Sequence, residues 1–180
     1  SLDSSFGGTG KVVTPIGASN EAAYKIRLQA DGKIVVAGNV SNGLNVDFGV
    51  VRYNADGTLD NTFNGNGKLV TTIGAQDERA YDLIVQADGK IVVGGWSSNG
   101  ANDDFALVRY HADGSLDTSF NGSGKLVTAI GAAEDQINSL AVQADGEIVV
   151  AGYTNIGGVD GSPSQVAAAK RLGIEGVRLG

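Results

Sequence analysis

The sequence predicts an all-β fold in which one antiparallel sheet recurs along the chain, and three observations support this. A constant step of 57 residues separates the copies of one motif, which begins at Gln29, Gln86 and Gln143. Within each copy, apolar and polar residues alternate over short runs rich in β-branched side chains, which is typical of half-buried strands. Asp-Gly pairs stand between successive runs, and this dipeptide favours tight hairpins because glycine adopts positive φ at little steric cost.

The second repeat shows most clearly how one unit is built. Its first strand is expected over residues 80–86, where Leu83 and Val85 belong to one constrained face. Asp82 and Ile84 occupy the intervening positions, which vary freely between repeats. The next strands are expected over residues 90–96, 104–110 and 125–130. No helical pattern separates these strands, so we expect neighbours to be antiparallel.

Repeated four-stranded sheets predict a β-propeller. A single sheet has two faces to cover, and radial stacking of copies covers both. A β-solenoid is the alternative, but its period is usually about 20–30 residues and it needs no repeated hairpins. We therefore expect propeller blades of four antiparallel strands per 57-residue repeat, with three blades in this chain.

The phase of the repeat sets the expected blade boundaries, because propeller blades usually begin at the innermost strand. We expect a closing outer strand within residues 1–22, whole blades at 23–79 and 80–136, and an incomplete third blade at 137–180 with a divergent segment at 158–180. Rings hold about 4–8 blades. Three blades therefore imply an excerpt of a longer propeller, or a six-bladed ring in which two chains exchange N-terminal strands.

The C-terminal segment departs from the repeat, and two interpretations compete. By alignment, residues 170–172 replace the third-strand residues 108–110 after an insertion. By local chemistry, residues 162–173 form a short helix with Ser162 as its N-cap and Pro163 at the first helical position. The alanines of this segment also favour a helix. We expect the helix, which would leave the third blade one strand short.

Composition excludes several classes of function. The net charge is −7 and the basic residues are scattered, so the chain has no electrostatic footprint for nucleic acid. No apolar run approaches the ~20 residues that span a membrane. The chain contains no cysteine, which excludes disulfides, thiolate chemistry and cysteine-based metal sites.

Three motifs in a fixed order resemble a known family. They are Leu-Asp-x-x-Phe-x-x-x-Gly-Lys at residues 59–68, Gln-Ala-Asp-Gly-Lys-Ile-Val-Val-x-Gly at 86–95 and Asp-Phe-x-x-Val-Arg-Tyr-x-Ala-Asp-Gly at 104–114. Over about residues 1–155 the chain resembles the bacterial delta-sixty repeat. The resemblance implies a β-propeller with a layout like that of NHL-type propellers, in secreted or surface-exposed bacterial proteins. It implies no catalytic residues.

Two turns carry a candidate calcium-binding pattern. Asp117 and Asn121 fit the first half of an oxygen-rich calcium loop, and Asp60 and Asn64 hold the same places one repeat earlier. However, the twelfth position is threonine in both copies, where a calcium loop has a carboxylate. The alternative, which we favour, is that the aspartate caps a tight turn while the neighbouring phenylalanine anchors it in the core.

The variable loops at one end of the ring form the predicted binding surface. They are residues 39–46, 96–103 and 153–161 between second and third strands, and 17–22, 74–79 and 131–136 before the inner strands. The candidate binding residues on them are Trp96, Asp103, Asp104, Tyr153, Asp77 and Glu78. Near these loops, Arg52 and Arg109 are expected to form structural ion pairs with Asp47 and Asp104.

These features predict a non-catalytic scaffold or binding module that recognises a protein or carbohydrate partner. The expected setting is extracellular or the bacterial cell surface, and a homodimer is one expected form. We expect no cofactor apart from the candidate calcium, no nucleic-acid partner and no membrane span. The alternatives are a structural self-assembly unit and a propeller hydrolase or lyase. The apolar inner strands argue against the enzyme.

Overall fold

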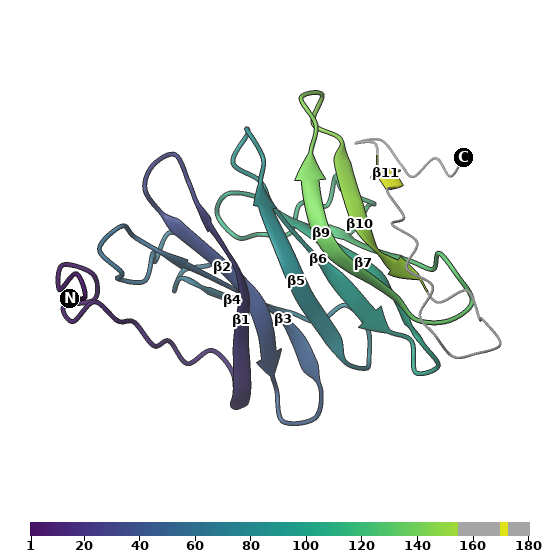
Figure 1. Cartoon of the computed structure of the whole chain (residues 1–180), viewed down its shortest axis with the longest axis horizontal. Helices are drawn as coiled ribbons and strands as arrows, with labels where there is room; N and C mark the ends of the chain where they lie inside the picture. The colour runs from purple at the N-terminus through teal and green to yellow at the C-terminus, as the bar shows by residue number, and fades with distance from the viewer. Residues whose placement is uncertain (155–169, 173–180) are drawn as a thin grey trace.

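The computed structural model describes residues 1–154 and the strand Lys170–Leu172, and every regular element in that part of the chain is a β-strand. The strands form three antiparallel sheets that lie side by side along the long axis of the molecule (Figure 1). The predicted all-β class is confirmed, and the sheets are consistent with propeller blades.

The first two sheets have the same order of four strands. The first sheet has the order β1-β2-β3-β4, with strands Ser19–Leu28, Ile34–Ser41, Val46–Tyr53 and Lys68–Thr71. The second has the order β5-β6-β7-β8, with strands Glu78–Val85, Ile91–Ser98, Asp103–Tyr110 and Lys125–Thr128. The registers repeat as well, because Ile34 pairs with Tyr53 as Ile91 pairs with Tyr110. The period of the sequence is therefore a period of the structure.

The third sheet corrects the expected C-terminal helix. Its strands are β9 (Asp135–Val142), β10 (Ile148–Thr154) and β11 (Lys170–Leu172), in the order β11-β10-β9. Ile148 of β10 pairs with Leu172 as Ile91 pairs with Tyr110, so β11 holds the place of a third strand. The helix is wrong for these three residues because the open edge of β10 binds a strand there, and such pairing outweighs local propensity. Residues 162–169 and 173 lie outside the described residues.

The predicted hairpins are confirmed at the Asp-Gly turns. In the second sheet, the N–H of Gln86 donates to the carbonyl of Lys90 at 2.8 Å, and Gly89 has a φ of 84°. The Asp88 carboxylate accepts the N–H of Lys90 at 3.1 Å, which fixes the turn from the side. The equivalent glycines of the other two repeats also have positive φ, namely Gly32 and Gly146.

Apolar side chains fill the two spaces between neighbouring sheets, so the middle sheet is covered on both faces. Leu83 of β5 packs into the cluster shared with the first sheet, together with Val50. The next residue, Ile84, packs into the cluster shared with the third sheet, together with Ile137. Successive residues of a strand point to opposite faces, and here both faces are buried.

A β-bulge interrupts the inner strands β1 and β5 at Tyr24 and Tyr81. On the neighbouring strand, a Cβ at Gly38 or Gly95 would overlap the carbonyl oxygen two residues before the bulged tyrosine, so these positions require glycine. The bulges take both tyrosines out of the strand alternation. Their rings meet edge to face, with centroids 5.6 Å apart.

The N-terminal segment differs from the expected outer strand. Residues 11–14 form no strand in this chain, because they make no ladder of hydrogen bonds with another strand. The inner strands also begin earlier than expected, at Ser19, Glu78 and Asp135. The role of residues 1–22 in closing a ring stays a prediction, as do the blade boundaries.

Candidate functional site

The loops between second and third strands are held by side-chain caps. In the second sheet, the amide of Asn99 donates to the Asp104 carboxylate at 2.9 Å, and its Oδ1 accepts the N–H of Asn102 at 3.1 Å. Asn42 donates to Asp47 in the same way one repeat earlier. Asp104 is buried, so it belongs to the internal network of its loop and not to an open binding surface.

Two further candidates on the rim are also structural caps. The Asp77 carboxylate accepts the N–H of Val46 at 3.0 Å and so links the first sheet to the second. Glu78 is fully buried, and its Oε1 accepts the N–H groups of Ile73, at 2.7 Å, and of Gly74. Its carboxylate therefore closes the loop that leads into β5, and the expectation of a solvent-facing Glu78 is wrong.

The environment of Glu78 favours its protonated form. Burial raises the pKa of Glu78 to about 7 despite the two backbone hydrogen bonds, and the charge of Asp47 contributes in the same direction. In the described part of the chain, Glu78 Oε2 and Asp47 Oδ1 are both buried and have no hydrogen-bond partner. Two carboxylates in this arrangement are costly when both are charged.

A Glu78→Gln variant should be more stable than the parent protein above pH 7. The folded-state pKa exceeds the unfolded value of 4.5, so the folded state holds the proton more tightly and stability falls as pH rises through this range. Glutamine keeps the Oε1 acceptor and removes the charge that Asp47 repels. We expect a gain of about 1–2 kcal/mol at pH 8, measured by urea unfolding.

The same comparison at pH 4 should show little difference, because the Glu78 carboxyl is then protonated in the folded state. Glu21 provides the matched control: it accepts the N–H of Ile16 at 2.7 Å one repeat earlier, but it is exposed. Glu21→Gln should therefore leave stability at pH 8 nearly unchanged. A destabilised Glu78→Gln protein at pH 8 would contradict the assignment.

One pair of carboxylates on the rim remains partly open to solvent. Glu134 accepts the N–H of Asp103 at 3.0 Å, and the amide of Gln136 donates to Asp103 Oδ2 at 3.0 Å. Burial raises the pKa of Asp103 to about 6, and the nearby charge of Glu134 adds to this. Between the first two sheets, the same places hold Val46 and Asp77, so only one carboxylate stands there.

Aromatic side chains lie beside this acid pair. Tyr153 is half-buried, and its pKa is raised by burial and then by its neighbours Tyr81 and Asp103. The indole N–H of Trp96 donates to the Tyr81 hydroxyl at 3.3 Å, and the Arg79 guanidinium lies 5.8 Å from the Trp96 ring centre. Trp96 is 7% exposed, so its role is to support Tyr81 and Arg79 more than to contact a ligand directly.

The structure thus brings three of the six candidates on the rim into one neighbourhood: Trp96, Asp103 and Tyr153. Sequence reasoning missed the contributions of Arg79, Tyr81 and Gln136. A signal for Arg79 and Gln136 existed in the repeat, because positions 22, 79 and 136 hold Ala, Arg and Gln. A position whose side-chain chemistry differs in every repeat is not needed for the fold that the repeats share.

The candidate calcium turns have the geometry of salt-bridged turns. Asp117 accepts Arg109 Nε at 2.7 Å and the N–H of Ser119 at 3.1 Å, whereas the amide of Asn121 donates away to the carbonyl of Lys125 at 2.8 Å. One repeat earlier the same contacts join Asp60 to Arg52 and Thr62, and Asn64 to Lys68. A cation at Asp117 would have to displace Arg109. Among the residues the structure describes, no cluster of three or more metal-ligating side chains exists.

The buried arginines have different partners from those expected. Arg52 and Arg109 pair with Asp60 and Asp117, and not with Asp47 and Asp104. The reason is that the chain folds back after the third strand, where Tyr110 bridges to Leu116 and brings Asp117 under the guanidinium. Burial alone would raise the pKa of Asp117, but the hydrogen bond from Ser119 and the charge of Arg109 lower it to about 2.

Comparison with known proteins identifies a family. The family model described as "Domain of unknown function (DUF5122) beta-propeller" matches residues 29–63, 86–120 and 143–162, which together make up half of the chain. Each matched segment begins at the first residue of one repeated hairpin motif. No curated protein matches the chain. In the described ranges, no helix is long and apolar enough to cross a membrane.

Proposed function

We propose a function from one premise: this chain belongs to the DUF5122 family of beta-propeller domains. On this scaffold the chain is a non-catalytic binding module that recognises a basic segment of a protein partner. The binding site is the acid pair Asp103 and Glu134 with the neighbouring Tyr153. A lysine or arginine of the partner would pair with the carboxylates and pack against the tyrosine ring.

The observation that carries this proposal is the difference between the two junctions of the sheets. The junction of the second and third sheets has two carboxylates at Asp103 and Glu134, where the first junction has one. Their repulsion contributes to the raised pKa of Asp103, and a bound cation would relieve it. No basic side chain of residues 1–154 forms an ion pair with either acid.

Two further features support a binding role. The net charge of −7 attracts basic partners over a distance. The only histidine, His111, follows β7 at its far end, whereas Asp103 begins that strand. His111 and the acid pair therefore lie at opposite ends of the strand, so the proposed site contains no imidazole base.

Loss of the acid pair should weaken the binding of a basic peptide. The probe is a fluorescein-labelled oligolysine peptide, and the measurement is fluorescence anisotropy at low ionic strength. We expect Asp103→Asn/Glu134→Gln to raise the Kd about tenfold, since the two exposed charge-assisted contacts are together worth on the order of 1–2 kcal/mol. Added salt should weaken the parent more than the variant.

A matched variant separates this site from general charge attraction. Asp56→Asn/Asp113→Asn removes two exposed turn carboxylates at the opposite end of the sheets, so the net charge changes equally. It should bind nearly as well as the parent. Equal loss in both variants would mean that the peptide senses net charge only, and the proposed site would be wrong.

A further inference from the structure

The first sheet exposes a face that its counterpart in the second sheet buries. On β1, Ile26 is 57% exposed and Leu28 is 75% exposed. One repeat later, Leu83 is fully buried against the first sheet, and Val85 packs beside it. The residues are equivalent, and the difference arises because β5 has a sheet beside it, whereas within the described residues β1 has none.

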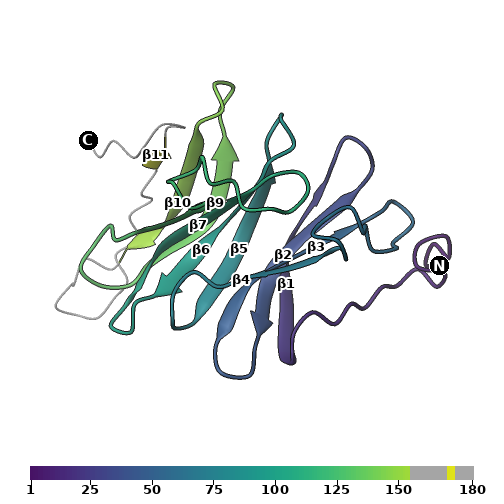
Figure 2. The ribbon, with the colours of Figure 1, turned by 180° about the vertical axis from the view of Figure 1, so that it is seen from behind.

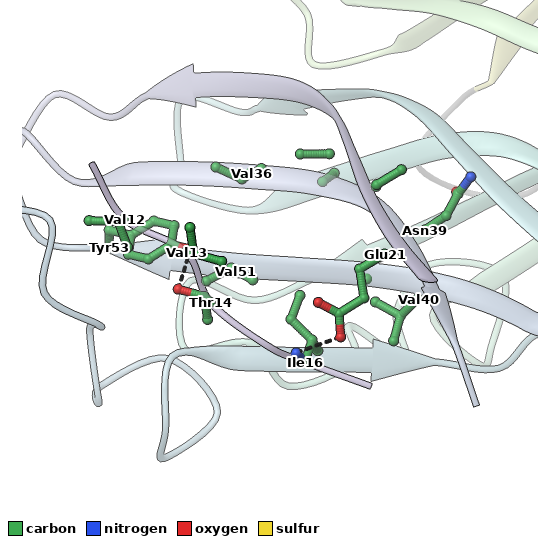
Figure 3. A pocket seen from close by; sticks show the side chains of 15 residues that line it. Val12, Val13, Thr14, Ile16, Glu21, Val36, Asn39, Val40, Val51 and Tyr53 are labelled. Carbon is green, nitrogen blue, oxygen red and sulfur yellow. Dashed lines mark hydrogen bonds between the residues drawn. The ribbon is translucent and has the colours of Figure 1, made fainter. Parts of the chain in front are cut away.

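A hollow lies over this exposed face. It has a volume of about 260 Å³ and is lined by Val36, Val51 and Tyr53 of the first sheet and by Val12 and Thr14 of the N-terminal segment (Figure 3). A second hollow of about 400 Å³ continues it along β1. The residues that line both hollows are mostly apolar. The surface that the second sheet presents to the first is apolar in the same way.

The N-terminal segment already occupies the place of an outer strand belonging to a missing sheet. The Tyr53 hydroxyl donates to Thr14 at 2.7 Å, as the Tyr110 hydroxyl donates to Thr71 of β4 at 2.7 Å. The lysine contacts repeat in the same way, joining Lys68 to the carbonyl of Pro15 and Lys125 to that of Thr72, each at 2.7 Å. Residues 11–16 therefore lie against the first sheet as β4 and its extension lie against the second.

The third sheet lacks the strand that this segment resembles. In the described residues it ends at β11, with no counterpart of β4 or β8. The sequence of residues 11–14 is Lys-Val-Val-Thr, and both β4 and β8 read Lys-Leu-Val-Thr. The segment and β11 lie at opposite ends of the molecule, so they do not pair within one copy (Figures 1 and 2).

We propose that the exposed face of the first sheet binds a second copy of this chain. The third sheet of one copy packs on β1 of the other, and residues 11–14 of each copy add a fourth strand to β11 of its partner. Two copies then form a closed two-fold ring of six sheets, which covers Ile26 and Leu28 and gives the third sheet of each copy the fourth strand that the other sheets have. The inference does not depend on the peptide site.

The register of the second sheet specifies a residue contact in this dimer. Val108 of β7 lies opposite Lys125 of β8, and the adjacent pair is joined by the hydrogen bond from Arg109 N–H to Gly124 at 2.9 Å. Val108 and Lys125 are therefore a non-hydrogen-bonded pair, in which the side chains are close. The equivalent residues place Lys11 of one copy opposite Lys170 of the other.

A disulfide cross-link tests this contact in a chain that has no cysteine of its own. The variant Lys11→Cys/Lys170→Cys, oxidised in solution, should run as a covalent dimer on a non-reducing gel and as a monomer after reduction. The single variants Lys11→Cys and Lys170→Cys should give no comparable cross-linking. Failure of the double variant to cross-link beyond the single variants would overturn the proposed strand exchange.

A second pair of variants tests the apolar face without cysteine chemistry. Ile26→Asp/Leu28→Asp places charges where the partner sheet should pack, and it should elute as a monomer while remaining folded, because both side chains are exposed in one copy. Leu44→Asp is the control, since Leu44 is 98% exposed on a loop away from this face, and it should stay dimeric. A dimeric Ile26→Asp/Leu28→Asp protein would overturn the proposal.

Discussion

An Arg109→Leu variant should lose about 3–5 kcal/mol of its free energy of unfolding, because the change leaves a buried carboxylate without its ion-pair partner. Arg109 is 2% exposed, and its Nε lies 2.7 Å from the equally buried Asp117. The guanidinium also donates to Ser119 at 3.1 Å and lies 4.8 Å from the ring centre of Phe120. Leucine fills much of the space but leaves the Asp117 charge without its main partner.

Urea unfolding at pH 7 measures the loss, and a second substitution identifies its cause. Arg109→Leu/Asp117→Asn removes the unpaired charge at position 117, while the asparagine oxygen still accepts the N–H of Ser119. This double variant should recover more than half of the lost stability. The control is Arg27→Leu, since the Arg27 side chain is 37% exposed and its ion pair is worth less than about 1 kcal/mol. Equal losses for Arg27→Leu and Arg109→Leu would contradict the account.

An Asp82→Ala variant should lose about 3 kcal/mol, because one carboxylate joins all three sheets. Asp82 is fully buried in β5. Its Oδ2 accepts the N–H of Leu140 in the third sheet at 2.8 Å, and its Oδ1 lies 3.1 Å from Lys25 Nζ of the first sheet. Alanine removes these contacts and leaves the buried N–H groups of Leu83 and Leu140 without their acceptor.

Chemical denaturation again provides the measurement, and Ser139 provides the matched control. The Ser139 hydroxyl donates to Asp82 at 3.3 Å from an exposed position, so Ser139→Ala should cost no more than about 1 kcal/mol. Asp82→Asn keeps an acceptor and should fall between the two. If Asp82→Ala were no more destabilising than Ser139→Ala, the carboxylate would not be a structural link between the sheets.

Local turn chemistry and the repeat made most of the fold predictable. The Asp88-Gly89 turn was expected because only a few residue types allow its backbone geometry, and the same chemistry recurs in each repeat. The strands that flank it follow from alternation and β-branched composition. Where these signals agree, the predicted strands match the observed ones within a few residues.

Two details were not predictable in the same way: which side chains fill the second face of the middle sheet, and which of the two interpretations of the C-terminal segment holds, where the observed pairing agrees with the alignment and not with the helix. The alternation in β5 indicated a strand with one constrained face, but a second sheet also covers the face of Asp82 and Ile84. The segment over residues 170–172 follows a helix-favouring sequence, yet its register is set by pairing with β10. Both outcomes depend on neighbours that are distant in sequence.

The candidate site was only partly predictable for a related reason. The sequence places Glu78, Asp103 and Asp104 on loops at one end of the sheets, but it does not show which carboxylates bind backbone N–H groups. Asp103 differs from the other two because its N–H donates to Glu134, which lies 31 residues away in the next repeat. That contact depends on how two sheets pack, and alternation within one strand carries no information about it.

In the proposed dimer, the exposed face of the first sheet and the incomplete edge of the third fit one another between two copies. The decisive experiment is multi-angle light scattering of the unmodified chain, over a range of micromolar concentrations and with or without calcium. We expect the mass of two 18.3 kDa chains, unchanged by calcium because the Asp60 and Asp117 carboxylates already bind arginine. The mass of one chain at every concentration would contradict the proposed dimer.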